Sequence, residues 1–323
     1  MRSVLPVFLV LLGGIGCAEA ADTGETPDAM AWLKKIAAAS RRVNYSGTFV
    51  YLHGNQVDTS RITHFANASG EYEKLETLDG PRREIVRNND NVTCYLPDTK
   101  TIVIEKRAAN HFPALLPEQL SGITGNYAVK KGGQDRVAGF DCQVIALEPR
   151  DDLRYGHQFC AELATGLPLR ARIYSDKNEM VESFAFTQLI IGNAVGKDML
   201  KSRFAGKSQT WRVDKSALEK KESSADTGWV LKNLPAGFKK LTEMRRSIAG
   251  HSTQVSHIVY SDGLAAVSAF IEPMPKTPPP AGPTYQGAIN IYVKSQADQM
   301  VTVVGEAPAR TVKQIAESLT PRD

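Results

Sequence analysis

The chain has 323 residues, of which 42% are hydrophobic and 23% are charged, so it is long enough to bury two cores of ordinary domain size. Its formal net charge of +4 is unevenly placed, because residues 21–200 carry 21 Lys and Arg against 23 Asp and Glu, whereas residues 201–323 carry 17 against 11. The basic second part is expected to meet acidic peptides, anionic lipid headgroups or polyanionic surfaces, and the export inferred below argues against nucleic acid.

The beginning of the chain has the pattern of a secretory leader over residues 1–20. Arg2 gives the positive start, an apolar run follows from Val4 to Ile15, and a small-x-small cleavage sequence stands at residues 18–20. Because the run is too short to span a bilayer, we predict a soluble exported protein whose mature chain begins near Ala21. The alternative is that Cys17 is the acylated cysteine of a lipoprotein.

The mature chain is predicted to open with a helix that precedes a long series of strands. The helix starts at residues 26–27 and ends at Asn44. Its apolar face carries Met30, Leu33, Ile36, Ala37 and Ser40. Short alternating segments then predict strands at residues 45–52, 60–66, 71–78, 83–88, 92–96, 101–106, 140–147, 154–162, 169–175 and 181–191. An antiparallel sheet of nine or more strands must curl strongly, and the helix is the expected cover of its concave face.

Three cysteines follow the leader, so the mature chain has at most one disulfide. Cys142 and Cys160 lie on two predicted strands joined by the polar turn at residues 148–152. If this hairpin is symmetric about residue 151, the two sulfur atoms lie opposite one another and a disulfide is possible. The alternative is a pair of buried free thiols, and Cys94 is expected to pack as a small apolar residue.

A change of composition marks the expected domain boundary. Residues 196–227 are rich in Lys, Ser and Asp and are interpreted as a linker between an N-terminal domain at 21–195 and a C-terminal domain at 228–320. In the C-terminal domain, strands are predicted at residues 239–248, 253–261, 264–272, 288–293 and 300–305. A last helix is predicted from Pro308, with one apolar face.

Catalytic and metal-binding motifs are absent from the sequence. The six histidines form no H-E-x-x-H or H-x-H motif, and there is no G-x-S-x-G or Walker-type loop. The acidic pair Asp151 and Asp152 is interpreted as a hairpin turn rather than a calcium site, because a metal would need several more oxygen ligands. We therefore expect no enzyme activity, no cofactor and no metal.

The most unusual feature of the N-terminal part is a set of arginines within segments that are predicted to be strands. Arg82 and Arg83 follow the turn at residues 79–81, Arg154 opens a strand, and Arg170 and Arg172 share a strand face. One interpretation is that each pairs with a nearby carboxylate, such as that of Glu73, Glu84 or Glu162. The other is a basic rim around an apolar cavity that accepts a phosphorylated or anionic amphiphile.

An ordered set of short sequences resembles the RseB/MucB family of periplasmic regulators. These sequences are LDGPRRE at 78–84, RY at 154–155, GLPL at 166–169, LPAGF at 234–238, YSDGL at 260–264 and VVGE at 303–306. They run in the family's order across nearly all of the mature chain. Cys160 stands where the family pattern has tryptophan, and Glu162 stands in place of aspartate, so the resemblance is weaker on that strand.

The resemblance implies a mostly β, α+β fold, in which a LolA/LolB-like unclosed antiparallel β-barrel with a helical lid precedes a smaller α+β domain. It implies a periplasmic negative regulator that binds the periplasmic domain of a membrane anti-sigma factor and protects it from site-one proteolysis. Displaced envelope lipid, lipopolysaccharide in particular, is the implied release signal. The alternative is a lipid or lipoprotein carrier of LolA/LolB type, although a plain carrier needs only the first domain. The sequence does not decide whether the protein forms a homodimer.

Two candidate surfaces complete the expectations. For the lipid, strand alternation and the helix face suggest an apolar pocket formed by Leu33, Ile36, Phe49 and Tyr51, with Arg82 or Arg83 at its mouth. A filled core without a cavity is the alternative. For the protein partner, the excess of positive charge beyond residue 200 suggests a surface formed by Lys239, Lys240, Arg245, Arg246 and Tyr260.

Overall fold

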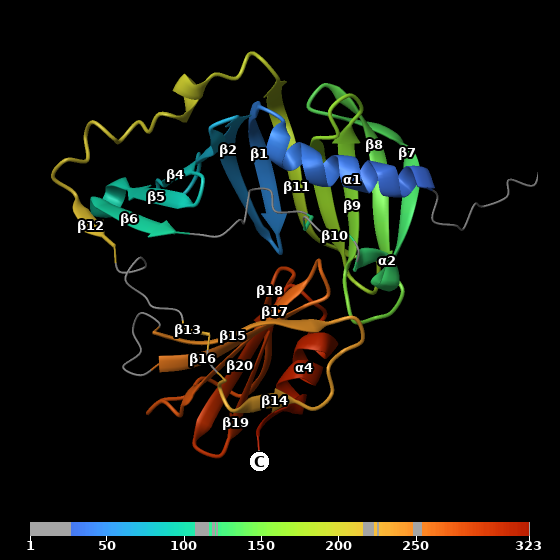
Figure 1. Cartoon of the computed structure of the whole chain (residues 1–323), viewed down its shortest axis with the longest axis vertical. Coiled ribbons are helices and arrows are strands. Elements are labelled where there is room, and N and C mark those ends of the chain that lie inside the picture. The colour runs from blue at the N-terminus through green and yellow to red at the C-terminus, as the bar shows by residue number, and fades with distance from the viewer. Residues whose placement is uncertain are drawn as a thin grey trace, which may run out of the picture.

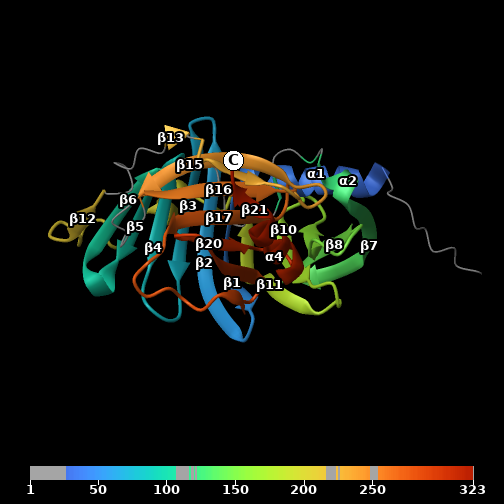
Figure 2. The same cartoon turned by 90° about the horizontal axis from the view of Figure 1, so that it is seen from below.

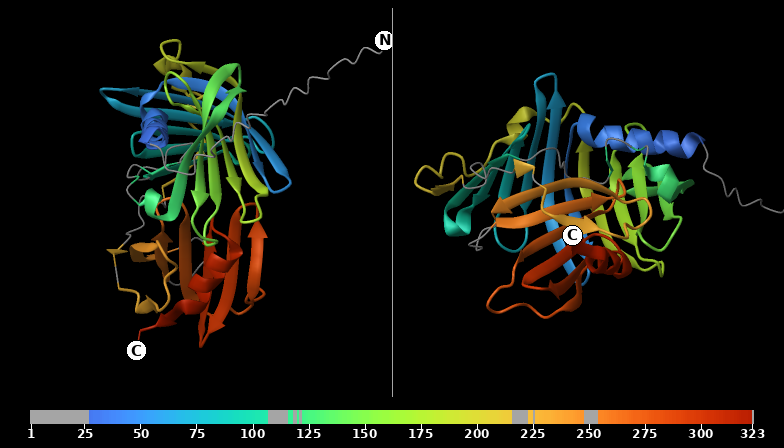
Figure 3. Two further views of the ribbon diagram at one scale, coloured as in Figure 1. Left: turned by 90° about the vertical axis from the view of Figure 1, so that its right-hand side faces the viewer. Right: turned by 60° about the horizontal axis from the view of Figure 1, so that its bottom comes forward.

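A computed structural model describes residues 27–106, 116–117, 120, 122–215, 223–224, 226–247 and 254–322. The predicted leader, Cys17 included, lies outside the described residues. A large curled sheet with a helix across it forms the N-terminal domain, and a smaller sheet with a helix lies beneath it (Figure 1). The two domains stack end to end in the side view, with the C-terminus far from the large sheet (Figure 3).

The N-terminal domain is built on a twelve-stranded sheet within the described residues. Its strands are β1 (Tyr45–His53), β2 (Gln56–Asn67), β3 (Gly70–Thr77), β4 (Glu84–Asn88), β5 (Asn91–Leu96), β6 (Thr101–Lys106), β7 (Tyr127–Val137), β8 (Phe140–Pro149), β9 (Gly156–Glu162), β10 (Pro168–Tyr174), β11 (Met180–Ile191) and β12 (Arg212–Asp214). Their order is β12-β6-β5-β4-β3-β2-β1-β11-β10-β9-β8-β7, so β12 and β7 are free edges and the barrel is unclosed. The predicted fold class is confirmed.

Helix α1 (Pro27–Arg42) lies across this sheet and packs against β2, β7, β8 and β10 (Figure 1). It starts at Pro27, whose missing N–H suits a first helical position. Leu33 and Ile36 are 0% and 1% exposed, and burying each such side chain contributes about 1.5–3 kcal/mol. The short helices η1 (Pro97–Thr99), α2 (Ile123–Asn126) and η2 (Lys197–Leu200) connect strands.

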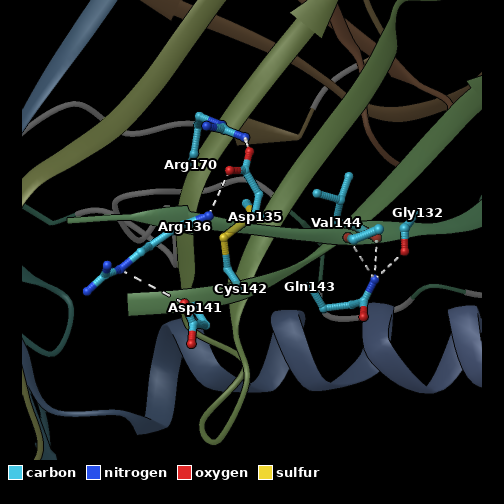
Figure 4. Close-up of a disulfide and its surroundings, with 10 residues drawn as sticks. Gly132, Asp135, Arg136, Asp141, Cys142, Gln143, Val144 and Arg170 are labelled. Atoms are coloured by element: carbon cyan, nitrogen blue, oxygen red, sulfur yellow. Dashed lines mark hydrogen bonds and ion pairs between the residues drawn. A yellow bond between two sulfur atoms is a disulfide. The ribbon is translucent and has the colours of Figure 1, made fainter. Parts of the chain in front are cut away.

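Cys142 on β8 and Cys160 on β9 form a disulfide with a Cα–Cα distance of 5.3 Å (Figure 4). The predicted hairpin register is wrong by one residue. Cys142 pairs with Glu162 and Val144 pairs with Cys160, so the symmetry centre is residue 152 and the two cysteines are diagonal neighbours. Diagonal residues on one face of a twisted antiparallel pair still approach closely enough for a bridge.

Strand β7 was not expected from the sequence. Its central residues Lys131 to Arg136 are polar and exposed, and the pairing with β8 is interrupted between Lys131 and Gln134. Such an irregular, charged edge strand lacks the alternation that reveals half-buried strands. The side chain of Gln143 fills the irregularity by donating to the carbonyls of Gly132 and Val144 (Figure 4).

The C-terminal domain contains a seven-stranded sheet with the order β13-β15-β16-β17-β20-β19-β18 and a two-stranded sheet of β14 and β21. The elements are β13 (Ser223–Ser224), β14 (Trp229–Leu231), β15 (Lys239–Ser247), β16 (Gln254–Ser261), β17 (Ala266–Pro273), β18 (Gly282–Gln286), β19 (Ile289–Gln296), β20 (Gln299–Gly305), α4 (Ala309–Ser318) and β21 (Leu319–Pro321). Val312, Ile315 and Ala316 of α4 are buried in the apolar cluster of this domain. Figure 2 shows this domain from below, in front of the large sheet.

The first part of the expected linker is attached to the N-terminal domain. Strand β12 pairs in parallel with β6, and the Arg203 guanidinium lies 2.8 Å from the Glu76 carboxylate. The Phe204 ring also contacts Tyr95, at 6.4 Å between centroids. The first part of the expected linker at residues 196–227 is therefore attached to the large sheet, at Arg203 and Phe204 and again at residues 212–214.

Candidate functional site

A pocket of about 620 Å³ opens beside the β1–β2 turn of the N-terminal domain. Its walls come from β1, β2, β3, the loop after β3 and the end of β5. The lining residues are Phe49, Tyr51, Gln56, Asp58, Ser60, Leu75, Thr77, Asp79, Gly80, Pro81, Arg82, Arg83 and Leu96. Its volume is within the range of small-molecule sites, about 300–1,000 Å³.

Strand alternation forms the apolar floor of this pocket. Phe49 and Tyr51 are two residues apart on β1 and share a face, and the Phe49 ring packs on Phe184 of β11 with centroids 4.9 Å apart. Phe49 belongs to the same buried cluster as Leu33 and Ile36, so the pocket continues from a packed core.

The loop after β3 forms the polar edge of the pocket. The Asp79 carboxylate accepts hydrogen bonds from the Thr59 N–H at 2.9 and 3.0 Å, which ties the loop to β2. Arg82 donates to Asp98 through Nε at 2.9 Å and Nη2 at 2.6 Å, and this contact lowers the pKa of the Asp98 carboxyl. Arg83 is exposed and forms no ion pair with the residues that the structure describes. A guanidinium that has no carboxylate partner among the described residues therefore lies at the mouth.

Tyr51 has a second role in the pocket wall. Its hydroxyl donates to Glu182 Oε2 of β11 at 2.7 Å, and Glu182 is only 6% exposed. Burial and the Glu182 carboxylate both raise the pKa of the Tyr51 hydroxyl far above its usual value. The phenol therefore stays a neutral hydrogen-bond donor at any physiological pH.

The structure brings together four of the six residues proposed for the lipid. Phe49, Tyr51, Arg82 and Arg83 all line the pocket, whereas Leu33 and Ile36 do not. The expectation for the two helix residues is corrected, because α1 packs directly on the sheet and fills the space that these side chains were expected to leave open.

Several pocket residues were missed at the sequence level, although the sequence contains a signal for them. Gly54 has a φ of +57° at the β1–β2 turn, and the hairpin pairs Tyr51 with Asp58 and Phe49 with Ser60. Centring a hairpin on residues 54–55 would have predicted these partners. No local signal leads to Glu182, which lies 131 residues from Tyr51 in the sequence.

A second constellation joins the two domains. Arg154, which is 0% exposed, donates through Nε to Asp151 at 2.8 Å and through Nη1 to Asp262 at 2.7 Å. Arg154 Nη2 also donates to the Ala236 carbonyl at 2.6 Å, and the Tyr127 hydroxyl donates to Asp262 at 3.1 Å. Burial opposes ionisation of Asp151, but the hydrogen bonds from Arg154 and from the Leu153 N–H, together with the charge of Arg154, outweigh it and lower the pKa of that carboxyl.

This junction corrects the interpretation of Arg154 as part of a basic rim. Its partners Ala236 and Asp262 lie in the short sequences at 234–238 and 260–264, so three of the segments that carry the family resemblance meet here. Carboxylate pairing is the right alternative for Arg82, Arg154 and Arg170, although not with the expected partners, since Arg170 pairs with Asp135 (Figure 4). It does not hold for Arg83, which forms no ion pair with the described residues. Asp98, Asp135 and Asp262 are distant from their arginines in the sequence, so local spacing did not reveal them, whereas Asp151 lies only three residues before Arg154.

The residues proposed for the protein partner divide into exposed and buried groups. Lys239, Lys240 and Arg245 on β15 are exposed, whereas Arg246 is half-buried with its guanidinium 5.4 Å from the Phe270 ring centroid. Tyr260 is 3% exposed and belongs to the apolar cluster of the C-terminal domain, and burial raises the pKa of its hydroxyl to about 12. The expectation that Tyr260 meets a partner is corrected, because its side chain is buried in the core of this domain.

The described part of the chain offers neither a metal site nor a membrane-spanning helix. Within it, no group of three or more His, Cys, Asp or Glu side chains could hold a metal ion. Of the helices described, none has both the length and the apolar character needed to cross a membrane.

Comparisons with known proteins cover both domains. Family models described as the MucB/RseB N-terminal domain and the MucB/RseB C-terminal domain match residues 28–204 and 223–320. The Sigma factor AlgU regulatory protein MucB of Pseudomonas aeruginosa is 32% identical, over 97% of this chain and 96% of its own length. The Sigma-E factor regulatory protein RseB of Escherichia coli K12 is 24% identical, over 93% of this chain and 92% of its own length.

Solved structures of the relative are also similar to this chain. MucB in complex with MucA(peri) has a TM-score of 0.72 at 30% identity and covers 92% of this chain and 100% of its own. The structure of MucB alone has a TM-score of 0.64 at 30% identity, over 92% of this chain and 99% of its own.

Proposed function

The chain belongs to the MucB/RseB family, and we propose that it binds the periplasmic segment of a membrane anti-sigma factor and so restrains a sigma factor of the AlgU/sigma-E type. The observation that carries this proposal is that the similar solved structure, which spans 92% of this chain with both domains, is a complex with MucA(peri). Bound along the regulator, the segment is shielded from site-one proteolysis. Isothermal titration of the mature chain with the periplasmic segment of an anti-sigma factor tests the proposal, and absence of saturable binding contradicts it.

The basic strand β15 is the proposed electrostatic part of the partner surface. Charge at the edge of an interface acts mainly on the association rate and is screened by salt. Replacing Lys239 and Arg245 together with alanine is expected to slow association with the segment roughly 3- to 10-fold at low salt and to flatten the salt dependence. Stopped-flow association measured at several salt concentrations checks this expectation.

Lys276 and Lys313 provide a matched control for the partner surface. Both are exposed lysines of the same domain but lie outside β15, so their double alanine variant keeps the same net charge as the test variant. Equal slowing in the test and control variants would show that only overall charge matters and would remove β15 from the interface.

The pocket beside the β1–β2 turn is the proposed lipid site. Phe49, Tyr51 and Leu75 offer an apolar wall, and Arg83 offers a cation at the mouth, which together suit an amphiphile with an acyl chain and a phosphorylated headgroup. Envelope lipid, including lipopolysaccharide, has this chemistry. A lipid or lipoprotein carrier would need the same pocket, but the 223–320 domain argues for a further protein partner.

Replacing Arg83 with alanine is expected to weaken binding of dodecyl phosphate roughly 3- to 10-fold, because an exposed charge-assisted contact contributes about 1 kcal/mol. Arg82→Ala is the matched control, since its guanidinium is already paired with Asp98 and should contribute less. Binding of a neutral dodecyl glycoside should be unaffected in both variants. Tryptophan fluorescence or calorimetric titration measures each dissociation constant, and equal losses in the two arginine variants would contradict the assignment of Arg83.

A further inference from the structure

The wall of the pocket is bonded to the junction between the domains through a single carboxylate. Glu182 accepts a hydrogen bond from the Tyr51 hydroxyl on one oxygen, Oε2, at 2.7 Å. Its other oxygen, Oε1, accepts from the main-chain N–H of Ala288 at 3.3 Å. Tyr51 lines the pocket, whereas Ala288 lies in the turn between β18 and β19 of the C-terminal domain.

The surroundings of this carboxylate leave little freedom for a different arrangement. Ala288 is 0% exposed and Glu182 is 6% exposed, so neither hydrogen bond is readily exchanged for one to water. Gly287 has a φ of +59°, and a Cβ atom there would lie 3.3 Å from His53 Cβ and 3.4 Å from Glu182 Oε1. The β18–β19 turn is thus pressed against the β1–β2 hairpin that borders the pocket.

We propose that Tyr51 and Glu182 form a relay that couples occupancy of the pocket to the contact between the two domains. This inference rests on the proposed lipid site. An acyl chain that lies against Phe49 takes the space beside the Tyr51 ring and turns the ring, which withdraws its hydroxyl from Glu182. Among the described residues, the buried carboxylate then keeps the Ala288 N–H as its donor, at 3.3 Å. An incompletely satisfied buried charge destabilises the arrangement that holds it.

The relay explains how a lipid in the N-terminal domain acts on a partner of the C-terminal domain. A ligand shifts an equilibrium only through different contacts in the two states, and here the differing contact is the Tyr51–Glu182 hydrogen bond. The Arg154 network lies elsewhere on the junction and has no residue in the pocket, so it serves as a fixed attachment about which the relay contact opens.

Amide hydrogen exchange of Ala288, followed by NMR on the whole mature chain, tests this relay. Binding of dodecyl phosphate is expected to speed exchange of this amide about 10-fold, since loss of a hydrogen bond to a buried charge favours local opening. In the Tyr51→Phe variant, which keeps the ring but lacks the hydroxyl, exchange should already be fast and should not respond to dodecyl phosphate. The amide of Lys232, which donates to the Ser318 carbonyl within the C-terminal domain, should be unchanged throughout.

Tyr155→Phe is the matched control variant. Tyr155 also places its hydroxyl at the domain junction, where it accepts a hydrogen bond from Asn290 at 2.8 Å, but it does not line the pocket beside the β1–β2 turn. The response of Ala288 to dodecyl phosphate should therefore persist in this variant. Its loss in Tyr155→Phe would show that any weakening of the junction abolishes the response and would overturn the specific role of Tyr51.

The failure of the relay and the failure of the lipid site are distinguishable. The comparison of Tyr51→Phe with the native chain needs no ligand, so equal Ala288 exchange in the two overturns the relay whatever the pocket binds. Saturable binding of dodecyl phosphate without a change at Ala288 also overturns it. A native chain that binds no dodecyl phosphate contradicts the lipid site, while faster Ala288 exchange in Tyr51→Phe would still support the bond between wall and junction.

Discussion

Replacing Arg154 with alanine is expected to destabilise the protein by about 3–5 kcal/mol, because it removes one partner of a buried ion pair and leaves the other charged. Arg154 and Asp262 are both fully buried, and Arg154 also satisfies the carbonyl of Ala236 across the junction. The midpoint of urea unfolding, followed by tryptophan fluorescence and circular dichroism, measures the loss. Arg82→Ala is the control, because its pair with Asp98 is exposed and such pairs contribute about 0–1 kcal/mol.

A second substitution distinguishes two causes of the loss of stability in Arg154→Ala, namely the unpaired charge of Asp262 and the missing packing of the arginine side chain. Asp262 Oδ1 accepts from the N–H groups of Leu264 and Ala265, and asparagine keeps that acceptor while it removes the charge. Asp262→Asn in the Arg154→Ala background is therefore expected to recover part of the stability. If Arg154→Ala were no more harmful than Arg82→Ala, the junction would not depend on this arginine.

The effect of Arg154 should also depend on pH. Arg154 lowers the pKa of the Asp151 carboxyl in the folded protein. The stabilisation from this ion pair is therefore fully present above the pKa of unfolded aspartate, and it is lost as the pH falls through the pKa of the folded state. The stability difference between the native chain and Arg154→Ala should consequently narrow in acid. Urea unfolding at neutral pH and at stepwise lower pH measures this change.

Removing the disulfide with the double variant Cys142→Ala and Cys160→Ala is expected to lower stability by about 3 kcal/mol, within a usual range of about 2–5 kcal/mol for native disulfides. The two cysteines are separated by 18 residues, and the bridge limits the unfolded chain across that loop. Their side chains are 0% and 2% exposed in the core, so the expected loss includes some packing.

Cys94→Ala is the control for the disulfide, since Cys94 is half-buried and outside the bridge. Urea unfolding with and without a reductant compares the variants. The native chain and Cys94→Ala should lose stability when reduced, whereas the double variant should not respond. A native chain that is insensitive to reduction after unfolding and refolding would contradict a stabilising role.

Much of the fold was predictable because one face of most strands is buried. Apolar residues recur at every second position in Tyr45–His53 and at helical spacing in α4, because one face of each element covers a core. Both patterns are therefore visible in the sequence. Strands β7 and β18 were missed for the opposite reason, because both are sheet edges with mostly exposed side chains. The register of the β8–β9 hairpin was missed by one residue because its turn has no glycine to fix its centre.

The candidate site divides in the same way. Phe49 and Tyr51 could be placed on one face of a strand, because they are two residues apart in an alternating segment. Arg82 and Arg83 could be placed near them, because a turn precedes these two arginines. Contacts across the fold could not be found, because Ala288 and Glu182 are 106 residues apart and no local pattern connects them. The burial of Arg154 likewise depends on its hydrogen bond to Asp262, which lies 108 residues away in the other domain.

The central claim is that one chain binds an anti-sigma segment and releases it when an amphiphile fills the N-terminal pocket. Titration of the segment with and without saturating dodecyl phosphate tests it most directly. Because coupling between sites is typically about 1–3 kcal/mol, the dissociation constant of the segment is expected to rise roughly 5- to 150-fold, and the segment should weaken dodecyl phosphate binding by the same factor. An unchanged dissociation constant would contradict the account and leave a two-domain binder that does not sense lipid through this pocket.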